Sequence, residues 1–500
     1  MKNVISVNTM RNADFNTIKS GVPSKLLMER AGNALLNCYH YKGKTALVCG
    51  TGNNAGDGYV FAYLLKTNGH QCTVFLTDKK FSPDGEFFYK RCLDSGVNVE
   101  YVSENTEFNK FDTIVDCIFG TGFHGKVDKT AATLIEKINA CGAYIISADI
   151  NSGLNGDNGM AEIAVKSNLT VSMGTLKPGH FLNQAKDYIG KVINADIGIP
   201  VPEGYGLVEA SDFGEYVSKR KNFSHKGTYG YVAIVGGSVH YAGAVKLASL
   251  GAAAMRSGSG VVKLIVPDKI YGALSKEITE CTVFTVNSDE TGAMEPQFDK
   301  IKESLKNIKA VAVGCGWGNG KNNLQILKFI LEEYNMPIVI DADGLNALAE
   351  DVSVLKNTKC SVVITPHVKE FARLTKQTTE EIINNPIVSA ENFAAQNNVI
   401  VVLKGPTTVV TDGEKTYLCD RGCAGMATAG SGDVLSGILV GVLGQNMNNL
   451  LLSVAYATFI NGLAGEFAQK EFTDICMTSK DTVTKIPNAV IYCRDYKDGD

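Results

Sequence analysis

Gly425-Met426-Ala427-Thr428-Ala429-Gly430-Ser431-Gly432-Asp433 is followed by the apolar run Val434-Leu435-Ser436-Gly437-Ile438-Leu439-Val440. The glycines and small residues predict a tight turn that opens a buried helix, because Gly permits a positive φ and a close backbone approach. The first N–H groups of a helix have no partner within it, so they can bind a phosphate or an oxyanion. A carboxylate at Asp433 could then accept a proton from a hydroxyl that attacks the phosphate. The simpler alternative is a glycine-rich helix start with Asp433 as an ordinary cap.

Short apolar, β-branched runs precede this stretch and alternate with longer segments that have room for helices. We expect strands in this half at residues 230–237, 261–266, 310–314, 337–341, 361–365 and 399–403. Nearly every one of them ends in Gly, Asp, Thr-Pro or Lys-Gly. Ligands of open α/β sheets bind beyond the carboxyl ends of the strands, so these ends are candidate site positions.

The first half of the chain repeats the same pattern. We expect strands at residues 45–49, 72–76, 113–118, 143–147, 169–173 and 190–195. The runs are apolar throughout and do not alternate strictly, which is typical of strands covered by helices on both faces. This half is therefore predicted to be a parallel, doubly wound sheet.

The pattern breaks around residues 197–225, where the turn-rich Ile199-Pro200-Val201-Pro202-Glu203-Gly204 precedes a short basic run. A chain of 500 residues exceeds the usual size of one domain. We therefore expect two domains, at residues 1–212 and 213–500.

The composition excludes several classes of function. The net charge of −4, with 20% charged residues, gives no electrostatic footprint for nucleic acid or an anionic membrane. No uninterrupted apolar stretch is long enough to cross a bilayer. The thirteen cysteines form no C-x-x-C pair and the chain begins without an apolar leader, which favours reduced thiols in the cytoplasm. We expect small-molecule substrates and a homo-oligomer, with no nucleic-acid or membrane partner.

A second glycine-rich segment, Gly50-Thr51-Gly52-Asn53-Asn54-Ala55-Gly56-Asp57-Gly58, lies between a predicted strand and a predicted helix at residues 59–65. Its spacing is not that of the dinucleotide fingerprint G-x-G-x-x-G. A plain Asn-Gly turn and a phosphate-binding loop are equally compatible with this segment alone. Asp116, inside a strand-like run, and Asp149, at a strand end, add two polar positions to the same sheet, which favours a common pocket.

The first half resembles the NAD(P)H-hydrate epimerase (YjeF N-terminal) family over roughly the first 210 residues. The matching pieces are Leu27-Met28-Glu29-Arg30-Ala31-Gly32, Asn53-Asn54-Ala55-Gly56-Asp57-Gly58, Gly120-Thr121-Gly122 and Lys177-Pro178-Gly179. The resemblance implies a Rossmann-like, three-layer fold, a bound K⁺ and epimerisation of nicotinamides hydrated at C6.

The resemblance also implies roles for individual residues. Asp149 would be the acid/base group, and Asn54, Asp116 and Ser152 would surround K⁺. The pocket for the hydrated nicotinamide would be lined by Asp149 together with Asn53, Asn54, Ala55, Gly56, Asp57, Gly120, Thr121, Gly122, Phe123, His124, Gly125 and Lys126. The chain has Asn151 where the family usually has Pro.

The second half is similar to the ADP/ATP-dependent NAD(P)H-hydrate dehydratase (YjeF C-terminal) family, over about residues 225–495. The matching pieces are Lys226-Gly227-Thr228-Tyr229-Gly230, Gly236-Gly237-Ser238, Tyr241-Ala242-Gly243-Ala244, Asp341-Ala342-Asp343-Gly344-Leu345-Asn346, Thr365-Pro366-His367, Lys404-Gly405-Pro406-Thr407-Thr408 and the run that ends at Asp433. The resemblance implies a ribokinase-like α/β fold. Fusion of both halves is typical of bacterial bifunctional members that use ADP.

For this half the resemblance implies that Asp433 deprotonates the C6 hydroxyl and that ADP or ATP is the co-substrate. We expect Mg²⁺ between the phosphates on general grounds. The substrate would be faced by Ala244, Gly318, His367 and Asp433. The nucleotide would be contacted by Lys404, Gly405, Pro406, Thr407, Thr408, Ala424, Gly425, Met426, Ala427, Thr428, Ala429, Gly430, Ser431 and Gly432.

Two other functions remain open at this point. Kinases of small vitamin precursors share a Gly-x-Gly-Asp anion hole, so the second half could be such a kinase. The first half could be a binding module without turnover. Retention of Asp149 favours catalysis.

Overall fold

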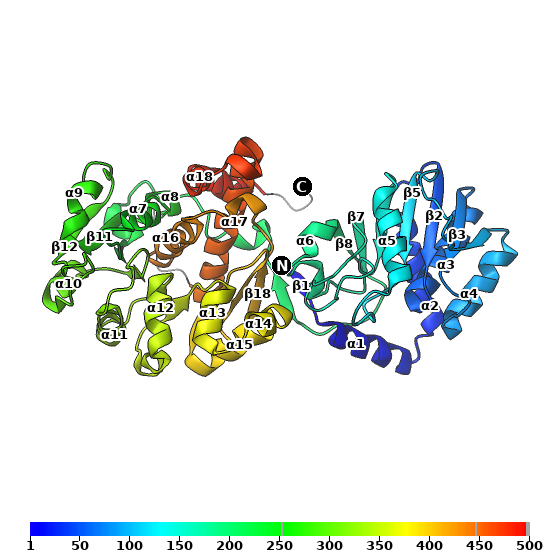
Figure 1. The fold of residues 1–500 in the computed structure, drawn as a ribbon, viewed down its shortest axis with the longest axis horizontal. Helices are drawn as coiled ribbons and strands as arrows, with labels where there is room; N and C mark the ends of the chain where they lie inside the picture. The colour runs from blue at the N-terminus through cyan, green and yellow to red at the C-terminus, as the bar shows by residue number, and fades with distance from the viewer. Residues whose placement is uncertain (252–253, 446–447, 497–500) are drawn as a thin grey trace. The chain divides into compact units, whose positions relative to one another are not determined.

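The computed structural model describes residues 1–251, 254–445 and 448–496. The chain divides into two compact units, Lys2–Tyr205 and Gly206–Asp500, and Met1 belongs to the second. Figure 1 shows that each unit is an α/β fold built on its own sheet.

The N-terminal unit is built on a parallel sheet with strand order β4-β3-β2-β5-β6-β7-β8. Its strands are β2 (Lys44–Cys49), β3 (Gln71–Leu76), β4 (Asn98–Tyr101), β5 (Thr113–Cys117), β6 (Tyr144–Ala148), β7 (Ser167–Met173) and β8 (Ile189–Ala195), and β1 (Lys2–Val4) precedes them. All six strands expected from the sequence are present. The edge strand β4 was not predicted, because Asn98-Val99-Glu100-Tyr101 is mostly exposed and lacks an apolar run.

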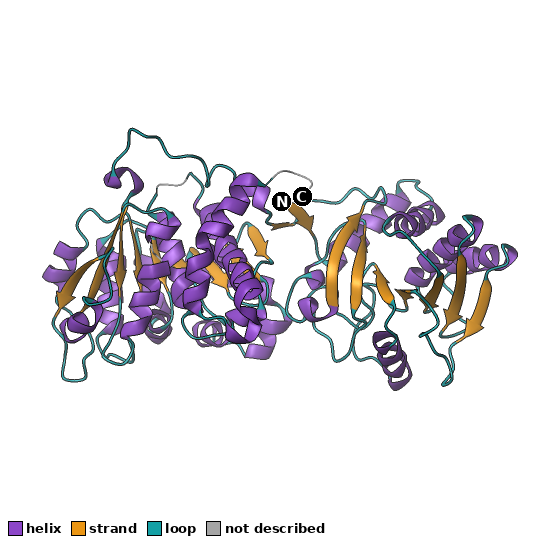
Figure 2. Cartoon of the chain, turned by 90° about the horizontal axis from the view of Figure 1, so that it is seen from above, coloured by secondary structure: helices purple, strands orange, loops and turns teal. Residues whose placement is uncertain are grey.

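Helices cover both faces of this sheet, as the view in Figure 2 shows. They are α1 (Val7–Lys19), α2 (Ser24–Asn37), α3 (Asn53–Thr67), α4 (Pro83–Asp94), α5 (Lys129–Ala140) and α6 (Ala185–Tyr188). Helices α1 to α4 bury their apolar side chains against one face, with Leu47, Val115 and Ile146. Helix α5 packs on the other face, with Val48 and Ile114. The unit is a three-layer, Rossmann-like fold, as expected.

Helix α3 differs from the sequence expectation at its N-terminus. We expected a loop up to Gly58 and a helix from Tyr59, but the helix begins at Asn53 after the extended Gly52. A Cβ on Gly50 would lie 2.0 Å from the carbonyl oxygen of Ile118. Glycine at this position therefore lets the end of β2 approach the end of β5 closely, and the Asn and Asp side chains of the motif are carried on the first turns of a helix.

The C-terminal unit has a larger sheet with the strand order β9-β18-β17-β16-β15-β14-β13-β10-β11-β12. Its strands are β9 (Tyr205–Leu207), β10 (Tyr231–Val235), β11 (Val261–Pro267), β12 (Thr282–Val286), β13 (Ala310–Val313), β14 (Ile338–Ile340), β15 (Val362–Ile364), β16 (Val399–Leu403), β17 (Thr408–Thr411) and β18 (Thr416–Cys419). In this order the strands from β16 to β12 are parallel, and of these only the edge strand β12 was not predicted. The β17–β18 hairpin is antiparallel and was not predicted.

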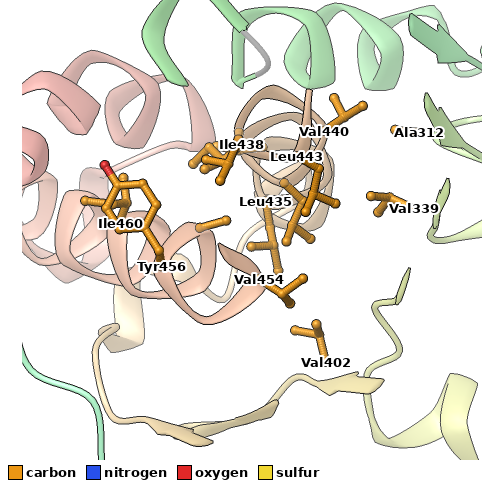
Figure 3. Packing of buried hydrophobic residues seen from close by; sticks show 14 of the residues in the cluster. Ala312, Val339, Val402, Leu435, Ile438, Val440, Leu443, Val454, Tyr456 and Ile460 are labelled. Atoms are coloured by element: carbon orange, nitrogen blue, oxygen red, sulfur yellow. The ribbon is translucent and has the colours of Figure 1, made fainter. Parts of the chain in front are cut away.

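Helices also lie on both faces of this sheet (Figures 1 and 2). They are α7 (Ala242–Gly251), α8 (Ala254–Ser257), α9 (Tyr271–Leu274), α10 (Phe298–Ser304), α11 (Asn323–Glu333), α12 (Asp343–Glu350), α13 (Val368–Thr375), α14 (Thr379–Asn384), α15 (Pro386–Asn397), α16 (Ser431–Leu443), α17 (Leu450–Cys476) and α18 (Ser479–Asp495). Every residue of α16 from Val434 to Leu443 is buried. Figure 3 shows α16 between Val339 of the sheet and Val454 of α17. The predicted buried helix is confirmed.

Helix α17 is, within the described part of the chain, the one helix long and apolar enough to cross a membrane. Its apolar window is 78% buried inside the unit, where Val454, Phe459 and Ala464 pack in the same core as α16. Packing between α16 and α18 therefore accounts for its composition. All thirteen cysteines are free in this structure.

Candidate active sites

A cavity of about 530 Å³ lies in the N-terminal unit at the carboxyl ends of β2, β5 and β6. The strand order reverses between β2 and β5, and this is where doubly wound sheets bind ligands. Of the residues predicted from the sequence, the lining contains Asn53, Asn54, Asp57, Gly120, Thr121, Gly122, Phe123 and Asp149. Three separate stretches of sequence thus meet in one cavity only through the fold.

The other predicted pocket residues lie away from the lining. Ala55, on α3, is buried in the core, and Gly56 of the same helix packs against the Met28 side chain. His124, Gly125 and Lys126 are exposed, and the Lys126 ammonium pairs with Glu162 at 2.7 Å.

Asp149 follows β6 in an unusual backbone conformation, with φ at +62°. A residue other than Gly in this region is strained and persists only where its surroundings hold it. Here the Lys177 ammonium lies 2.5 Å from Oδ1, and the Met173 N–H donates to the same oxygen at 3.2 Å. The Lys177 ammonium also donates to the Met173 carbonyl at 2.8 Å and is almost fully buried. The Asp149 carboxylate is therefore fixed in one orientation.

His180 completes the support of Asp149. Its Nδ1 accepts a hydrogen bond from the Lys177 N–H at 3.1 Å, so the proton of the neutral ring is on Nε2, which donates to the Asp149 carbonyl at 2.8 Å. Burial and the neighbouring Lys177 lower the pKa of His180 to about 4, so the ring stays neutral. Burial by itself would raise the pKa of Asp149, but Lys177 outweighs it and holds the pKa below the ordinary value. Asp149 is thus an ionised carboxylate at neutral pH.

Asp57 has the opposite character. Burial, followed by the negative charges of Asp149 and Asp14, holds the pKa of Asp57 well above its ordinary value. Asp14 of α1 also lines the cavity, and burial raises its pKa. The cavity therefore contains carboxyl groups whose pKa values are shifted in opposite directions.

The three residues predicted to hold K⁺ lie together under this cavity. The fully buried Asp116 accepts hydrogen bonds from Ser152 Oγ at 2.5 Å and Ser152 N–H at 2.9 Å. Asn54 donates through Nδ2 to the Phe119 carbonyl at 2.9 Å, and Ser152 Oγ lies 3.3 Å from the same carbonyl. Asn54 Oδ1 is buried with no hydrogen-bond partner in the described part of the structure. The Phe119 carbonyl and Ser152 link Asn54 to the buried Asp116, and this unpartnered oxygen suits a cation.

Asn151, the departure from the family pattern, is fully buried. Its Nδ2 donates to the Val165 and Tyr188 carbonyls at 2.8 and 3.0 Å, and its Oδ1 accepts from Thr170 Oγ1 at 2.5 Å. This side chain anchors the turn that carries Asp149 and Ser152, a task that a Pro ring cannot perform with hydrogen bonds.

The second candidate site lies in the C-terminal unit, at the carboxyl ends of β10, β13 and β14, where the strand order again reverses. Gly430, with φ at +90°, is the N-cap of α16, and Asp433 lies in the first turn. Burial and the neighbouring Asp341 carboxylate raise the pKa of Asp433 to about 6, although a hydrogen bond with the Cys315 thiol opposes the shift.

A network of charged side chains surrounds Asp433. Lys404 pairs through Nζ with Asp341 Oδ1 at 3.0 Å, and Ser436 Oγ of α16 donates to Asp341 Oδ2 at 2.7 Å. Glu370 Oε2 lies 3.9 Å from Lys404 Nζ. The negative charges of Asp341 and Glu370 raise the pKa of Lys404 despite its burial, so the ammonium stays charged.

His367 reaches this network from the start of α13. Its Nδ1 accepts from the N–H groups of Lys369 and Glu370 at 3.1 and 3.2 Å, and its side chain is half exposed. His367 therefore caps α13 and also lies beside Lys404.

Gly318 and Ala244 lie on neighbouring segments. The Gly318 N–H donates to Asp343 Oδ2 at 2.7 Å. A Cβ on Gly316 would lie 2.7 Å from the Ala244 Cβ, so the loop after β13 packs closely on α7. Both predicted substrate positions thus border the end of β10.

The predicted nucleotide positions form two loops. Lys404 joins the first loop to the charged network, and Gly432 joins the second, since a Cβ on Gly432 would lie 3.4 Å from Lys404 Nζ and Asp341 Oδ2. The second loop is anchored by Gln469, which accepts from the Gly425 N–H at 3.0 Å, and by Ser479 Oγ, which donates to the Ala429 carbonyl at 2.6 Å. Solvent reaches Gly405, Pro406, Ala424, Ala427, Thr428 and Ala429.

Several residues of both sites were not singled out from the sequence. They are Asp14, Lys177, His180, Cys315, Asp341, Asp343, Glu370 and Ser436. Asp341 and Lys177 stand within quoted motifs, and the position of Asp341 directly after a strand was the available signal. No pattern in the sequence marks Asp14 or Cys315. Among the described residues, no three His, Cys, Asp or Glu side chains gather as a metal cluster.

Comparison with known proteins gives one family match in each of the two units. The sequence model described as YjeF-related protein N-terminus matches residues 24–179, and that of NAD(P)H-hydrate dehydratase matches residues 232–488. The chain is 31% identical to the bifunctional NAD(P)H-hydrate repair enzyme of Moorella thermoacetica, over 93% of this chain and 92% of the relative. It is 32% identical to the enzyme of the same name from Archaeoglobus fulgidus, over 98% of this chain and 99% of the relative.

A solved structure supports the fold of the C-terminal unit. A ribokinase-like superfamily protein from Enterococcus faecalis superposes with a TM-score of 0.50 at 23% identity, covering 58% of this chain and 97% of that one. The C-terminal unit therefore has a ribokinase-like fold. On the full-length matches and both domain matches, the chain belongs to the family of bifunctional NAD(P)H-hydrate repair enzymes.

Proposed function

We propose that this chain returns hydrated NAD(P)H to NAD(P)H in two reactions. Residues 1–212 interconvert the R and S epimers, and residues 213–500 dehydrate the S epimer with ADP, or with ATP in its place. The observation that carries the proposal is one polar site at the carboxyl edge of each sheet, in a chain that matches bifunctional repair enzymes along almost its whole length.

The N-terminal cavity has the groups that epimerisation needs. The hydroxyl of the substrate stands on a carbon next to nitrogen, so the C–O bond can break and re-form on either face when protons are transferred to and from the oxygen. Asp149 is the acid/base group in this proposal. Its carboxylate lines the cavity and is held by Lys177, and the residues of the lining given above bind the nicotinamide.

K⁺ fits the cluster beneath the cavity. Asn54 Oδ1, buried and without a partner among the described residues, and the Asp116 carboxylate supply hard oxygen ligands, and the Ser152 hydroxyl adjoins them. Bound there, K⁺ would supply a fixed positive charge that offsets Asp116. The three residues also tie the loop around Phe119 to the turn after Asp149.

In the C-terminal unit, Asp433 acts as the base on the C6 hydroxyl. With a pKa of about 6, it is ionised at neutral pH yet basic enough to accept a proton. The N–H groups from Gly430 to Gly432 stabilise the charge on the transferred phosphoryl group. The resulting phosphate leaves C6 with assistance from the lone pair of the ring nitrogen.

The nucleotide is placed by the two loops described above, and Lys404 supplies a positive charge at their junction. Mg²⁺ fits the surroundings, because Asp341 and Asp343 leave negative charge that raises the pKa of Asp433. Asp341 and Asp343 would hold Mg²⁺, which would supply positive charge to the phosphates. His367, Ala244 and Gly318 contact the hydrated nicotinamide in this assignment.

The alternative of a vitamin-precursor kinase fused to a non-catalytic module is not favoured. A vitamin-precursor kinase has no need of an N-terminal partner domain, and here that domain matches the same repair enzymes as the rest of the chain. The cytoplasmic location and the homo-oligomeric state stay predictions, and light scattering tests the second.

One incubation tests the function. The purified chain is given a mixture of R and S hydrated NADH with ADP, with ATP or with no nucleotide, and both epimers are followed by chromatography. We expect loss of both epimers with a nucleotide and exchange between them without one. Loss of S alone would leave the N-terminal unit a binding module, and phosphorylation of a vitamin precursor with no loss of either epimer would favour the kinase.

A further inference from the structure

The cavity of the N-terminal unit holds two carboxyl groups with very different partners. Asp149 is paired with the buried Lys177 ammonium at 2.5 Å. Asp57, on α3, lines the same cavity, and in the described part of the chain it has no ion-pair partner. The two side chains come from different elements, since Asp149 follows β6 and Asp57 lies in the second turn of α3.

The orientation of Asp149 limits what it can reach. Its Oδ1 is held by Lys177 Nζ and by the Met173 N–H, and its backbone is held at a positive φ by surrounding contacts. A carboxylate fixed in this way serves one face of a bound ring. Inversion at C6 requires departure of oxygen from one face and addition of oxygen to the other, and a proton-carrying group on each face would serve both steps.

We propose that Asp57 is a second catalytic residue of the epimerase, which protonates the departing C6 hydroxyl on the face of the ring opposite to Asp149. This inference rests on the epimerase function proposed above. It replaces a single shuttling carboxyl with an acid on one face and a base on the other.

The step balances as follows for the conversion of R to S. Asp57 gives its proton to the C6 hydroxyl, the C–O bond breaks, and water leaves while the nitrogen lone pair forms a C=N⁺ bond. A second water adds to C6 from the opposite face and gives a proton to Asp149. One water leaves and one enters, and the carboxyl groups return to their starting states by proton exchange with solvent. The reverse reaction uses Asp149 as the acid and Asp57 as the base.

The electrostatics of the cavity support this assignment. Burial and the charges of Asp149 and Asp14 hold the pKa of Asp57 well above its ordinary value, which favours the protonated form that an acid needs. Lys177 keeps Asp149 ionised. Two carboxyl groups whose surroundings move their pKa values apart are the usual pattern of an acid and a base in one site. The titratable and charged groups around Asp57 are Arg11 and Asp14 of α1, Asp84 of α4, Cys117 of β5, Asp149 and Lys177.

The proposal is tested on the full chain with R hydrated NADH and no nucleotide. We expect Asp57→Asn to lower kcat for R-to-S conversion by roughly 10²–10⁴-fold, with little change in KM, because a general acid contributes about that much. Asp57→Glu keeps a carboxyl and should recover part of the rate. An equal loss in both variants, or a loss confined to KM, would make Asp57 a binding residue only and overturn the proposal.

The pH profile separates acid catalysis from a structural role. The wild-type rate should fall as pH rises through the pKa of Asp57, since the acid is then lost. Asp14→Asn removes a negative charge that faces Asp57, so this alkaline limb should move to lower pH. An alkaline limb that stays in place in Asp14→Asn and persists in Asp57→Asn contradicts the assignment.

Isotope transfer tests the bond that breaks. In heavy-oxygen-labelled water, each R-to-S conversion should place one labelled oxygen at C6, whereas unlabelled S product would exclude cleavage of the C–O bond. If the wild-type chain does not interconvert the epimers at all, the proposed function fails. If the wild type works and Asp57→Asn works equally well, only this inference fails.

Discussion

The two units each place an aspartate at the carboxyl edge of a parallel sheet, but they tune it in opposite directions. Asp149 lies against the Lys177 ammonium, which keeps its pKa below the ordinary value despite burial. Asp433 lies near the Asp341 carboxylate, and burial together with that charge raises its pKa to about 6. Burial acts to raise the pKa of both aspartates, and the sign of the neighbouring charge decides whether that rise is reversed, as at Asp149, or increased, as at Asp433.

The backbone conformation also differs between the two aspartates. Asp149 is held at φ +62° by contacts from His180 and Met173, while Asp433 is an ordinary residue in the first turn of α16. In the N-terminal unit the strain falls on the aspartate. In the C-terminal unit the positive φ falls on Gly430, which adopts it at little cost.

Among the variants that test this comparison of the two units, we expect Asp433→Asn to have the largest effect on activity. Loss of the base should lower nucleotide-dependent recovery of reduced-nicotinamide absorbance by roughly 10²–10⁴-fold, while interconversion of the epimers continues. The absorbance assay measures the first reaction and chromatography the second. Unimpaired recovery of absorbance would remove Asp433 from its role.

The same variant makes a prediction about stability. A carboxyl whose folded pKa is raised from 3.8 to about 6 destabilises the fold as pH rises through that interval. Asp433→Asn should therefore be more stable than the wild type above pH 6, by up to about 3 kcal/mol, and this gain should vanish near pH 4. Urea unfolding at several pH values measures it.

Asp149→Ala is the matched change in the other unit. Enzymatic conversion of R to S should fall by roughly 10²–10⁴-fold, while the S epimer is still consumed with a nucleotide. The rate without protein is the baseline for the measurement. An R epimer that is still interconverted well above that baseline would show that the N-terminal assignment is wrong.

The sequence predicted the parts of both sites that are built from contiguous motifs. The glycine-rich run before Asp433 predicted the buried α16, because its small residues and apolar continuation are local signals. Most parallel strands of both sheets were predicted from their apolar runs, and the edge strands β4 and β12 were not. The antiparallel hairpin β17–β18 was not, since Thr408–Thr411 and Thr416–Cys419 are only four residues each.

The partners that tune each aspartate could not be predicted, because they come from distant segments. Lys177 is 28 residues beyond Asp149, and Ser436 lies 95 residues from the Asp341 that it binds. The register of the sheet and the packing of α16 bring these groups together. The first turns of α3 were assigned to a loop for a local reason, because Asn53 to Gly58 contain two Asn and two Gly residues, which favour turns.

Lys177→Met should remove the charge that keeps the pKa of Asp149 low. Removing the ammonium leaves the carboxylate buried and unpaired, which costs about 3–5 kcal/mol at neutral pH. The stability that Lys177 gives to ionised Asp149 is present above the unfolded pKa near 3.8 and is lost as pH falls through the lower folded value. The difference from the wild type in urea unfolding should thus shrink in acid. A constant difference at all pH values would indicate a packing effect.

Asp341→Asn should bring Asp433 closer to the behaviour of Asp149. Without the neighbouring negative charge, the pKa of Asp433 should fall from about 6, and the acidic limb of the dehydratase rate should move to lower pH. Ser436→Ala is the control, because it removes a hydrogen bond to Asp341 Oδ2 but keeps the charge. An equal displacement of the limb in both variants would contradict the electrostatic explanation.

The smallest effects are expected at the two glycines that begin α16. Gly430→Ala forces a side chain into φ +90° and places Cβ 2.3 Å from Leu247 Cδ1, so it should destabilise the unit by about 1–2 kcal/mol. Gly432→Ala adds a methyl group at an ordinary 3.4 Å from Lys404 Nζ and Asp341 Oδ2, within a helix that favours Ala over Gly by up to about 1 kcal/mol. Gly432→Ala should keep or raise the thermal midpoint yet weaken ADP binding in calorimetry, because the methyl group occupies the space beside the helix amides. If ADP binds Gly432→Ala as tightly as the wild type, the nucleotide's phosphates do not lie over the start of α16.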